Sequence, residues 1–331
     1  MKQHGLILKL IEIGIKLMKK TAEELAMVGL KIELPEDFLE EELRCGYWVT
    51  TEMKKVWAVE LDLLNELQRV CKKHEIQYFA DGGTVLGAVR HQGFIPWDDD
   101  IDIAMTRENY ENLCLVAAEE FHEPYFFQTE YTDRGSLRGH AQLRNSLTTA
   151  ILEGEEFLDI NHGIFIDIFP LDAVTDNVAE FEKQRQEIKK LKKKIFQIAN
   201  CTDRYNPYDV GKKRLLKKII HYFSPIIIMM MDYDNLYRKY EKICQKHNTE
   251  KSEYVSLLSF HSDWDRLIRR RKDYDEYTHM NFEFMKIPVM ACYEDILTRL
   301  YGDWSIPVKG TSAHGKPFFD VEHPYTDYVN H

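Results

Sequence analysis

An alternation of acidic and apolar residues near position 100 constrains this chain more than any other feature of its sequence. Asp100 and Asp102 alternate with Ile101 and Ile103, and a period of two is typical of a half-buried strand. Residues two apart on a strand share a face, so we expect two carboxylates side by side. Unit charges 4 Å apart repel by roughly 4 kcal/mol at an effective dielectric constant near 20. Protonation of one acid would avoid that cost, and a bound cation would reverse it. Oxygen ligands favour Mg²⁺ or Mn²⁺.

A glycine-containing turn precedes this strand. The apolar residues 76–80 predict an earlier strand, and Gly82, Gly83 and Thr84 follow it. Glycine lets backbone N–H groups approach a phosphate closely, and a helix that begins at Thr84 would direct its positive end to the same place. We therefore expect these three residues to bind the phosphates of a substrate.

Three familiar motifs do not account for this segment. A Walker A loop requires Lys-Ser/Thr where the chain has Ala88 and Val89, and the dinucleotide-binding fingerprint requires a Gly-x-Gly that is absent here. A calcium loop that begins at Asp98 would need glycine at its sixth position and glutamate at its twelfth, where Ile103 and Asn109 stand. The segment therefore predicts a metal and phosphate site of another class.

The whole segment 78–105, YFADGGTVLGAVRHQGFIPWDDDIDIAM, resembles the signature of the LicD/fukutin family. Residues 166–172 (IDIFPLD) resemble a second family block, and residues 293–304 (YEDILTRLYGDW), with His314 downstream, resemble a third. The resemblance spans about residues 50–325. The chain differs at residues 281–285 (NFEFM), where relatives usually have a glycine after Phe-Glu, and this difference concerns the acceptor side of the site.

The resemblance implies a nucleotidyltransferase-like fold and a metal-dependent transferase. Such an enzyme moves a phospho-alcohol, such as phosphocholine or ribitol phosphate, from a CDP-activated donor to a sugar hydroxyl and releases CMP. The acceptor would be a cell-surface glycan, such as lipopolysaccharide, teichoic acid or capsule, or its lipid-linked precursor. The resemblance also implies that Asp167 joins Asp100 and Asp102 as a third catalytic acid, either as a further Mg²⁺ or Mn²⁺ ligand or as the general base. For His314 both a surface position and a catalytic role stay open.

Two arginines are candidates for binding the donor's phosphates. Arg90 lies between the glycine turn and the acidic strand. Arg144 ends the segment GHAQLR, which resembles a family motif, and its guanidinium could hold a pyrophosphate through two hydrogen bonds. The alternative for Arg144 is a solvated arginine beside a strand.

The composition limits the partners of the chain. A net charge of −11 argues against a general nucleic-acid-binding protein, whose affinity would rest on Lys and Arg. The six cysteines form no Cys-x-x-Cys pair, which predicts neither a zinc site nor a disulfide framework. Charged residues interrupt the apolar N-terminus, unlike in a secretory signal, and the longest apolar run, 219–231, is shorter than the about 20 residues of a membrane span. We therefore expect a cytoplasmic protein.

The predicted fold class is α/β (α+β), with a small mixed sheet flanked by helices and a mostly helical C-terminal region. Residues 1–49 are expected to form an N-terminal amphipathic helix and a linker, and residues 50–175 the catalytic core. Residues 176–331 are expected to form a helical region and a C-terminal tail that pack on the core. Short strands are expected at 124–129, 138–144 and 148–152.

Several segments combine basic and apolar residues. Residues 6–28 have the period of an amphipathic helix, and basic residues at 181–194 and 212–218 precede the apolar run at 219–231. These segments predict either solvated helical faces or a surface that contacts anionic lipid at the inner face of the cell membrane. Arg269, Arg270 and Arg271 predict a further solvated cluster.

Two other functions stay open from the sequence. A glycosyltransferase that uses a sugar nucleotide also has an Asp-x-Asp metal site, and it would release a nucleoside diphosphate instead of CMP. A non-catalytic relative would bind a nucleotide without turnover.

Overall fold

The computed structural model describes residues 29–208, 214–250, 252–260, 267–310 and 314–329. The amphipathic helix expected at 6–28 lies outside these ranges. Within them, no helix is both long enough and apolar enough to cross a membrane.

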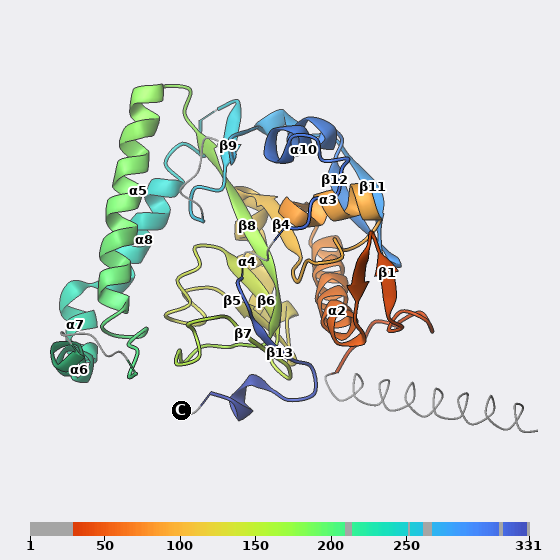
Figure 1. Ribbon diagram of the computed structural model, residues 1–331. Coiled ribbons are helices and arrows are strands. Elements are labelled where there is room, and N and C mark those ends of the chain that lie inside the picture. The colour runs from red at the N-terminus through yellow and green to blue at the C-terminus, as the bar shows by residue number, and fades with distance from the viewer. Residues whose placement is uncertain (1–28, 209–213, 251, 261–266, 311–313, 330–331) are drawn as a thin grey trace, which may run out of the picture.

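A seven-stranded mixed sheet forms the centre of the molecule (Figure 1). The long strand β8 has β4 along one edge, and β6 and β9 along successive parts of the other edge. Only the pairing of β4 with β8 is parallel in this sheet. Its strands are β3 Phe79–Ala80, β4 Asp102–Thr106, β5 Tyr125–Gln128, β6 Ala141–Asn145, β8 Ile164–Val174, β9 Tyr254–Ser256 and β10 Arg269–Arg270.

Three small antiparallel sheets surround the central one. Their strand pairs are β1 Glu42–Arg44 with β2 Tyr47–Val49, β7 Thr149–Ile151 with β13 Phe318–Asp320, and β11 Tyr277–Phe282 with β12 Met285–Met290. The α-helices are α2 Thr51–Lys73, α3 Gly82–His91, α4 Arg107–Glu120, α5 Val178–Ala199, α6 Arg214–Tyr222, α7 Ser224–Met231, α8 Tyr233–Cys244 and α10 Tyr293–Tyr301. Two short 3₁₀ helices are η1 Arg271–Tyr274 and η2 Tyr325–Asp327.

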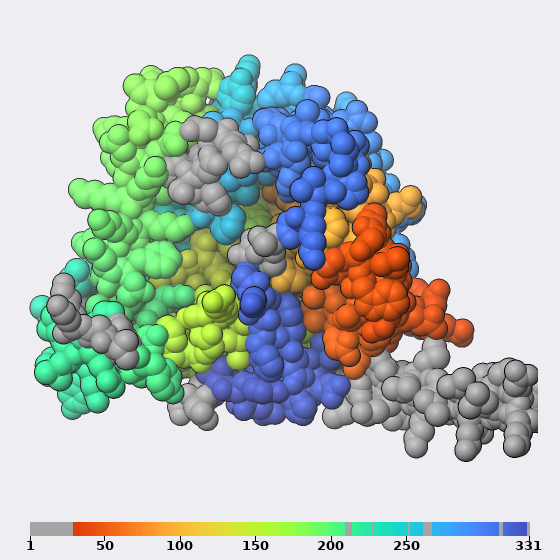
Figure 2. All heavy atoms as spheres, in the orientation of Figure 1, coloured from red at the N-terminus to blue at the C-terminus, as the bar shows by residue number. Residues whose placement is uncertain are grey.

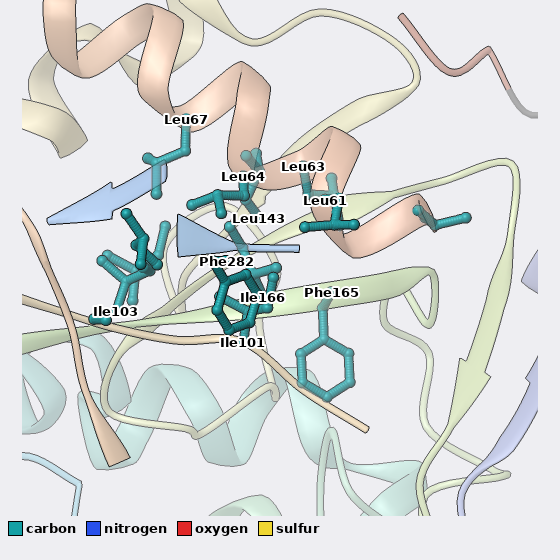
Figure 3. Packing of buried hydrophobic residues seen from close by; sticks show 14 of the residues in the cluster. Leu61, Leu63, Leu64, Leu67, Ile101, Ile103, Leu143, Phe165, Ile166 and Phe282 are labelled. Carbon is teal, nitrogen blue, oxygen red and sulfur yellow. The ribbon is translucent and has the colours of Figure 1, made fainter. Parts of the chain in front are cut away.

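Helix α2 anchors the core beneath the central sheet. Its first turn is capped by Thr50, whose side chain accepts a hydrogen bond from the backbone N–H of Met53. Leucines on α2 are fully buried and pack against isoleucines of β4, of the residue just before it, and of β8 (Figure 3). Because burying one such side chain contributes about 1.5–3 kcal/mol, this contact holds the strands that carry the acidic residues. The packed residues are Leu61, Leu64, Leu67, Ile101, Ile103 and Ile166.

The predicted fold class is confirmed. Helices flank a mixed sheet, and α5 to α8 form the helical part that follows the core, on the left of Figure 1. The chain then returns to the centre, because β9 and β10 add two strands to the same sheet as β4 and β8. The strands expected at 124–129, 138–144 and 148–152 correspond to β5, β6 and β7.

Candidate active site

The N-terminus of α3 forms one wall of the candidate site. The helix begins at Gly82, two residues before the expected start, and the Asp81 carboxylate accepts a hydrogen bond from the Gly82 N–H at 2.8 Å. Gly82 has a φ of +51°, and a Cβ atom there would lie 2.5 Å from Oδ2 of Asp102. A Cβ on Gly83 would lie 2.5 Å from Oδ2 of Asp98. The two glycines are therefore needed because carboxylates pack directly against this helix end.

The strand β4 brings the predicted acids to the same place. Asp102 is its first residue, and Asp100 lies in the segment just before it. The Asp102 N–H donates to the Thr84 hydroxyl at 2.7 Å, and Thr84 is buried. Thr84 thus holds the backbone of Asp102. Asp102 is the register partner of Asp167 on the parallel strand β8.

These residues line one pocket of about 290 Å³. Gly82, Asp100, Asp102 and Asp167 contribute to its wall, as expected from the sequence, and His314 joins them from the C-terminal segment. Figure 2 shows the C-terminal residues, in blue, lying across the middle of this face of the molecule. The other lining residues are Asp81, Phe169, Leu257, Phe260, Leu267, Arg269, Leu300 and Tyr301.

The acidic residues of the pocket outnumber its basic residues. Burial raises the pKa of Asp100 well above its usual value, and Asp98 raises it further. Burial, followed by Asp100 and Asp167, does the same for Asp102. Burial lowers the pKa of His314, but its contacts with Asp99, Asp100 and Asp167 outweigh burial and raise this pKa to about 9. The site therefore gains stability from any cation that it binds, whether a proton or a metal ion.

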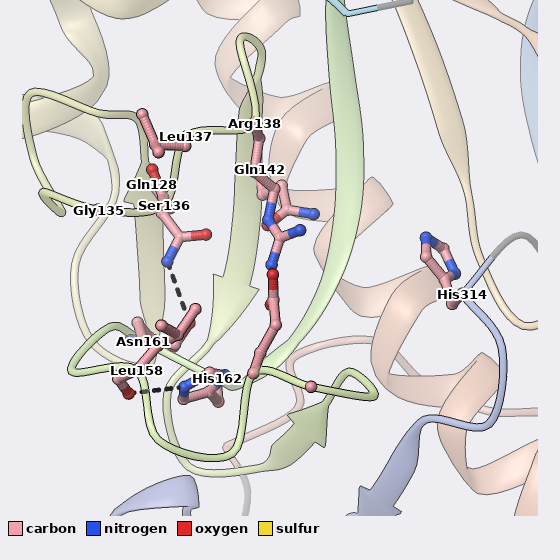
Figure 4. A network of polar contacts seen from close by, with 12 residues as sticks. Gln128, Gly135, Ser136, Leu137, Arg138, Gln142, Leu158, Asn161, His162 and His314 are labelled. Carbon is pink, nitrogen blue, oxygen red and sulfur yellow. Dashed lines mark hydrogen bonds and ion pairs between the residues drawn. The ribbon is translucent and has the colours of Figure 1, made fainter. Parts of the chain in front are cut away.

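Asp167 is oriented by His140, just before β6, and by Gln142 on β6. Its Oδ1 atom is 2.8 Å from Nε2 of His140 and accepts a hydrogen bond from the Gln142 amide at 2.6 Å. Its Oδ2 atom lies 4.0 Å from Nε2 of His314. Burial alone would raise the pKa of Asp167, but His140, His314 and Gln142 outweigh burial and lower it to about 2. Figure 4 shows Gln142 on β6 and His314 in the C-terminal segment.

Neither predicted arginine is brought into the pocket. Arg90 lies eight residues beyond the start of α3, about 12 Å along a helix that rises 1.5 Å per residue, and it donates to Trp304 O at 2.8 Å. Arg144 is fully buried and is satisfied by protein groups, so it is not a solvated arginine either. Its Nε donates to Gln128 Oε1 and its Nη1 to Gly163 O, both at 2.7 Å, and its Nη2 donates to Gln142.

The site also contains residues that the sequence interpretation missed. Arg269, expected to be solvated, is only 3% exposed and lines the pocket. Its neighbour Arg270 is partly exposed, because successive strand residues point to opposite faces. His140 and Gln142 were also missed, although they alternate with apolar residues at the period that identified Asp100 and Asp102.

The donor set fits a divalent metal ion. Asp100, Asp167 and His314 each offer a ligand atom, and these atoms lie within 4.8 Å of one another. Asp98, Asp99 and Asp100 form a second such group. Carboxylate oxygens with an imidazole nitrogen suit Mn²⁺, and the oxygens alone suit Mg²⁺. Among the described residues Asp102 belongs to neither group, although it lines the same pocket.

A family of known proteins matches the part of the chain that contains the acids of the pocket. Residues 75–202 match the LicD/FKTN/FKRP nucleotidyltransferase domain, a range that includes Gly82, Asp100, Asp102 and Asp167. The chain carries a LicD-family nucleotidyltransferase domain. The family resemblance seen in the sequence is thus confirmed.

A relative named as LicD matches most of the chain, and two other relatives match shorter parts of it. "Lipopolysaccharide cholinephosphotransferase LicD" of Haemophilus influenzae is 26% identical over 264 residues, which cover 76% of this chain and 91% of the relative. "Uncharacterized protein RP689" of Rickettsia prowazekii is 40% identical over 70 residues, or 21% of this chain and 24% of the relative. "Uncharacterized protein RT0683" of Rickettsia typhi is 47% identical over 47 residues, or 14% of this chain and 15% of the relative.

Proposed function

We propose that this chain transfers phosphocholine, or a similar phospho-alcohol, from a CDP-activated donor to a sugar hydroxyl of a lipopolysaccharide-type glycan or its lipid-linked precursor. The observation that carries the proposal is the shared pocket in which Asp100, Asp102 and Asp167 lie against the N-terminus of α3. The similarity to the Haemophilus cholinephosphotransferase supports the choice of donor alcohol and of acceptor class.

A divalent metal ion belongs to the proposal, because the carboxylates of the pocket repel one another and their ligand atoms converge. Asp100 and Asp167 would hold it, with Asp102 beside them. When bound, Mg²⁺ or Mn²⁺ supplies positive charge that stabilises the phosphate oxygens of the donor.

The transfer breaks the phosphoanhydride bond of the donor and forms a phosphoester bond to the acceptor. The acceptor oxygen forms a bond to the phosphorus that carries the alcohol, the bond from that phosphorus to the oxygen of CMP breaks, and CMP leaves with the electron pair. The hydroxyl proton is released from the acceptor. The N-terminus of α3, whose first N–H groups have no partner within the helix, would orient the donor's phosphates. Apolar residues of the pocket, Leu257, Leu267 and Leu300, would limit the access of water, which would otherwise hydrolyse the donor.

We also propose that α6 and α7 contact an anionic membrane while the chain modifies a lipid-linked acceptor. These helices carry exposed apolar side chains next to the exposed basic residues Arg214 and Lys218. Such a combination suits a surface that lies in the interface of a bilayer without crossing it. The exposed apolar residues are Leu215, Leu216, Ile219, Tyr222, Phe223, Ile226, Met229, Met230 and Met231.

The test of the activity is a donor panel with Mg²⁺ or Mn²⁺. CDP-choline, CDP-ribitol and UDP-sugars are incubated with the protein and a lipopolysaccharide acceptor, and nucleotide products are followed by mass spectrometry. We expect CMP from one CDP-alcohol, and a loss of more than about 100-fold in Asp100→Ala and Asp102→Ala. The matched control is Asp176→Ala, which changes an exposed acid outside the family blocks. Release of a nucleoside diphosphate from a UDP-sugar would instead identify a glycosyltransferase, and binding without turnover a non-catalytic relative.

A further inference from the structure

Arg269 supplies a buried positive charge to the pocket from a distant part of the chain. It begins β10, where it pairs with Val255 of β9, so the central sheet fixes its backbone. Its side chain is 3% exposed and lines the same pocket as Asp102 and Asp167. This residue lies outside the matched family domain at 75–202.

The guanidinium of Arg269 is only partly satisfied by the protein. Its Nη2 lies 2.8 Å from Oδ1 of Asp81, and its Nη1 donates to the Tyr274 hydroxyl at 2.8 Å. Its Nε–H is buried and has no hydrogen-bond partner among the described residues. A buried charged donor without a partner is costly, and the side chain that carries it lines the pocket, so a ligand in the pocket could supply the missing acceptor.

The position of Arg269 matches the chemistry of a phosphate. Asp81 caps α3, so the guanidinium lies beside a helix end whose first N–H groups have no partner within the helix. The carboxylates of Asp100 and Asp167 line the same pocket. A cation on these carboxylates, together with Arg269, would give the pocket two positive charges, which suits the two charged phosphates of a pyrophosphate.

We propose that the Nε–H of Arg269 binds a phosphate oxygen of the nucleotide-activated donor. The assignment rests on the proposed function for the identity of the donor, but the ligand chemistry it requires is only that of a pyrophosphate. Arg269 then has the phosphate-binding role that the sequence had suggested for Arg90 and Arg144. Asp81 and Tyr274 hold the guanidinium in place, so the side chain loses little conformational entropy when the phosphate binds.

The test compares Arg269→Lys with Tyr274→Phe. Lysine keeps a positive charge for Asp81 but removes the Nε–H, whereas Tyr274→Phe removes a partner of Nη1 and leaves the Nε–H in place. Binding of inorganic pyrophosphate is measured by calorimetry with and without Mg²⁺. We expect Arg269→Lys to weaken binding by about 10-fold or more, and Tyr274→Phe by less than about 3-fold. Wild-type affinity in a folded Arg269→Lys protein would overturn the proposal.

Two further measurements separate this inference from folding and from the proposed function. In the wild-type protein, the ¹⁵N resonance of the Arg269 Nε–H, assigned by its shift in Tyr274→Phe, should move when pyrophosphate is added. An unchanged resonance at saturation would overturn the inference even if Arg269→Lys did not fold. Arginine-dependent pyrophosphate binding without CMP release from any CDP-alcohol would leave the anion site standing while the proposed function failed. Normal turnover with an unchanged donor KM in Arg269→Lys would overturn the anion site while the proposed function stood.

Discussion

Asp102 and Asp167 are register partners on the adjacent parallel strands β4 and β8. Partners on neighbouring strands lie about 4.8 Å apart and point to the same face of the sheet. This pairing gives Asp167 a place in the pocket that the linear sequence cannot show, since no local pattern joins residue 167 to residue 102. It also poses the question of what Asp167 contributes there.

The first prediction is that Asp167 acts as a metal ligand and not as the general base. A carboxylate whose pKa is lowered to about 2 is a weak base at neutral pH. We expect Asp167→Asn to lower turnover by about 100-fold at low metal concentration, and part of the loss to be recovered by raising Mn²⁺. The measurement is CMP release as a function of Mn²⁺ and pH. An unchanged metal dependence, with a kcat defect that diminishes at high pH, would favour the general base.

The second prediction concerns stability without metal. Asp98, whose pKa is raised to about 6, and Asp100 and Asp102, whose pKa values are also raised, bind protons in the folded state that the unfolded chain has released. Their contribution to stability therefore becomes less favourable as the pH rises from their unfolded pKa of 3.8 through their folded pKa values. The pKa of His314 is raised from 6.5 to about 9. Its contribution to stability is therefore fully present below pH 6.5 and is lost as the pH rises through 9. Both effects lower stability toward alkaline pH.

A metal ion should reverse this trend, because it replaces the protons. We expect the Tm of the metal-free protein to fall between pH 6 and pH 8.5, and saturating Mg²⁺ to raise Tm by about 5 °C more at pH 8.5 than at pH 6. Asp102→Asn should reduce this difference. Scanning calorimetry with EDTA or Mg²⁺ measures both, and an equal metal effect at the two pH values would contradict the prediction.

Local patterns predicted the parts of the site that lie close together in sequence. Gly82, Asp100 and Asp102 were identified because a turn and a strand each have a short-range signature. The burial of Arg144 and Arg269 was not predicted, because burial depends on which face of a strand meets the rest of the chain. Gln142 and Arg144 of β6 share the face of Asp167. His140, just before the strand, continues the same period of two, so this signal was present in the sequence. For Arg269 nothing in the sequence shows that β10 pairs with β9.

The third prediction assigns a positioning role to His140. His140→Phe keeps a ring against Phe169 and Phe260 but removes the contact with Asp167. We expect metal affinity to fall by about 10- to 100-fold, because partners that orient a ligand typically have effects of this size. The matched control is His162→Phe, since His162 is also buried but bonds to Leu158 O (Figure 4). Metal titration followed by Tm distinguishes the two variants, and equal losses in both would indicate a packing effect.

The fourth prediction is that Arg144 supports the fold and does not bind the donor. Arg144→Met leaves Gln128, Gln142 and Gly163 without their donor and removes the contact of the guanidinium with the Phe165 ring, 4.6 Å away. We expect the free energy of unfolding to fall by roughly 3 kcal/mol, while the KM for the donor changes by less than about 2-fold below the Tm. A donor KM that rises by more than about 10-fold at unchanged stability would restore the phosphate-binding role.

The fifth prediction concerns the surface of α6 and α7. Each basic residue near an anionic bilayer contributes about 1 kcal/mol, and this attraction decays within a Debye length of about 10 Å at 0.1 M salt. We therefore expect sedimentation with phosphatidylglycerol-containing vesicles at low salt, weaker binding at high salt, and little binding to pure phosphatidylcholine. Equal partition to both kinds of vesicle, or to neither, would mean that this surface is simply solvated.

Variants can distinguish vesicle binding through α6 and α7 from nonspecific hydrophobic binding. Ile219 and Met229 are exposed on α6 and α7. The double variant Ile219→Glu/Met229→Glu places two negative charges where lipid contact is proposed, so we expect its affinity for vesicles to fall by about 10-fold or more. Leu115→Glu is the matched control, since Leu115 is an exposed leucine on α4, and it should bind vesicles as the wild type does. Because α6 and α7 contribute no residue to the catalytic pocket, the double variant should keep its turnover on a water-soluble acceptor and lose it on an acceptor held in vesicles.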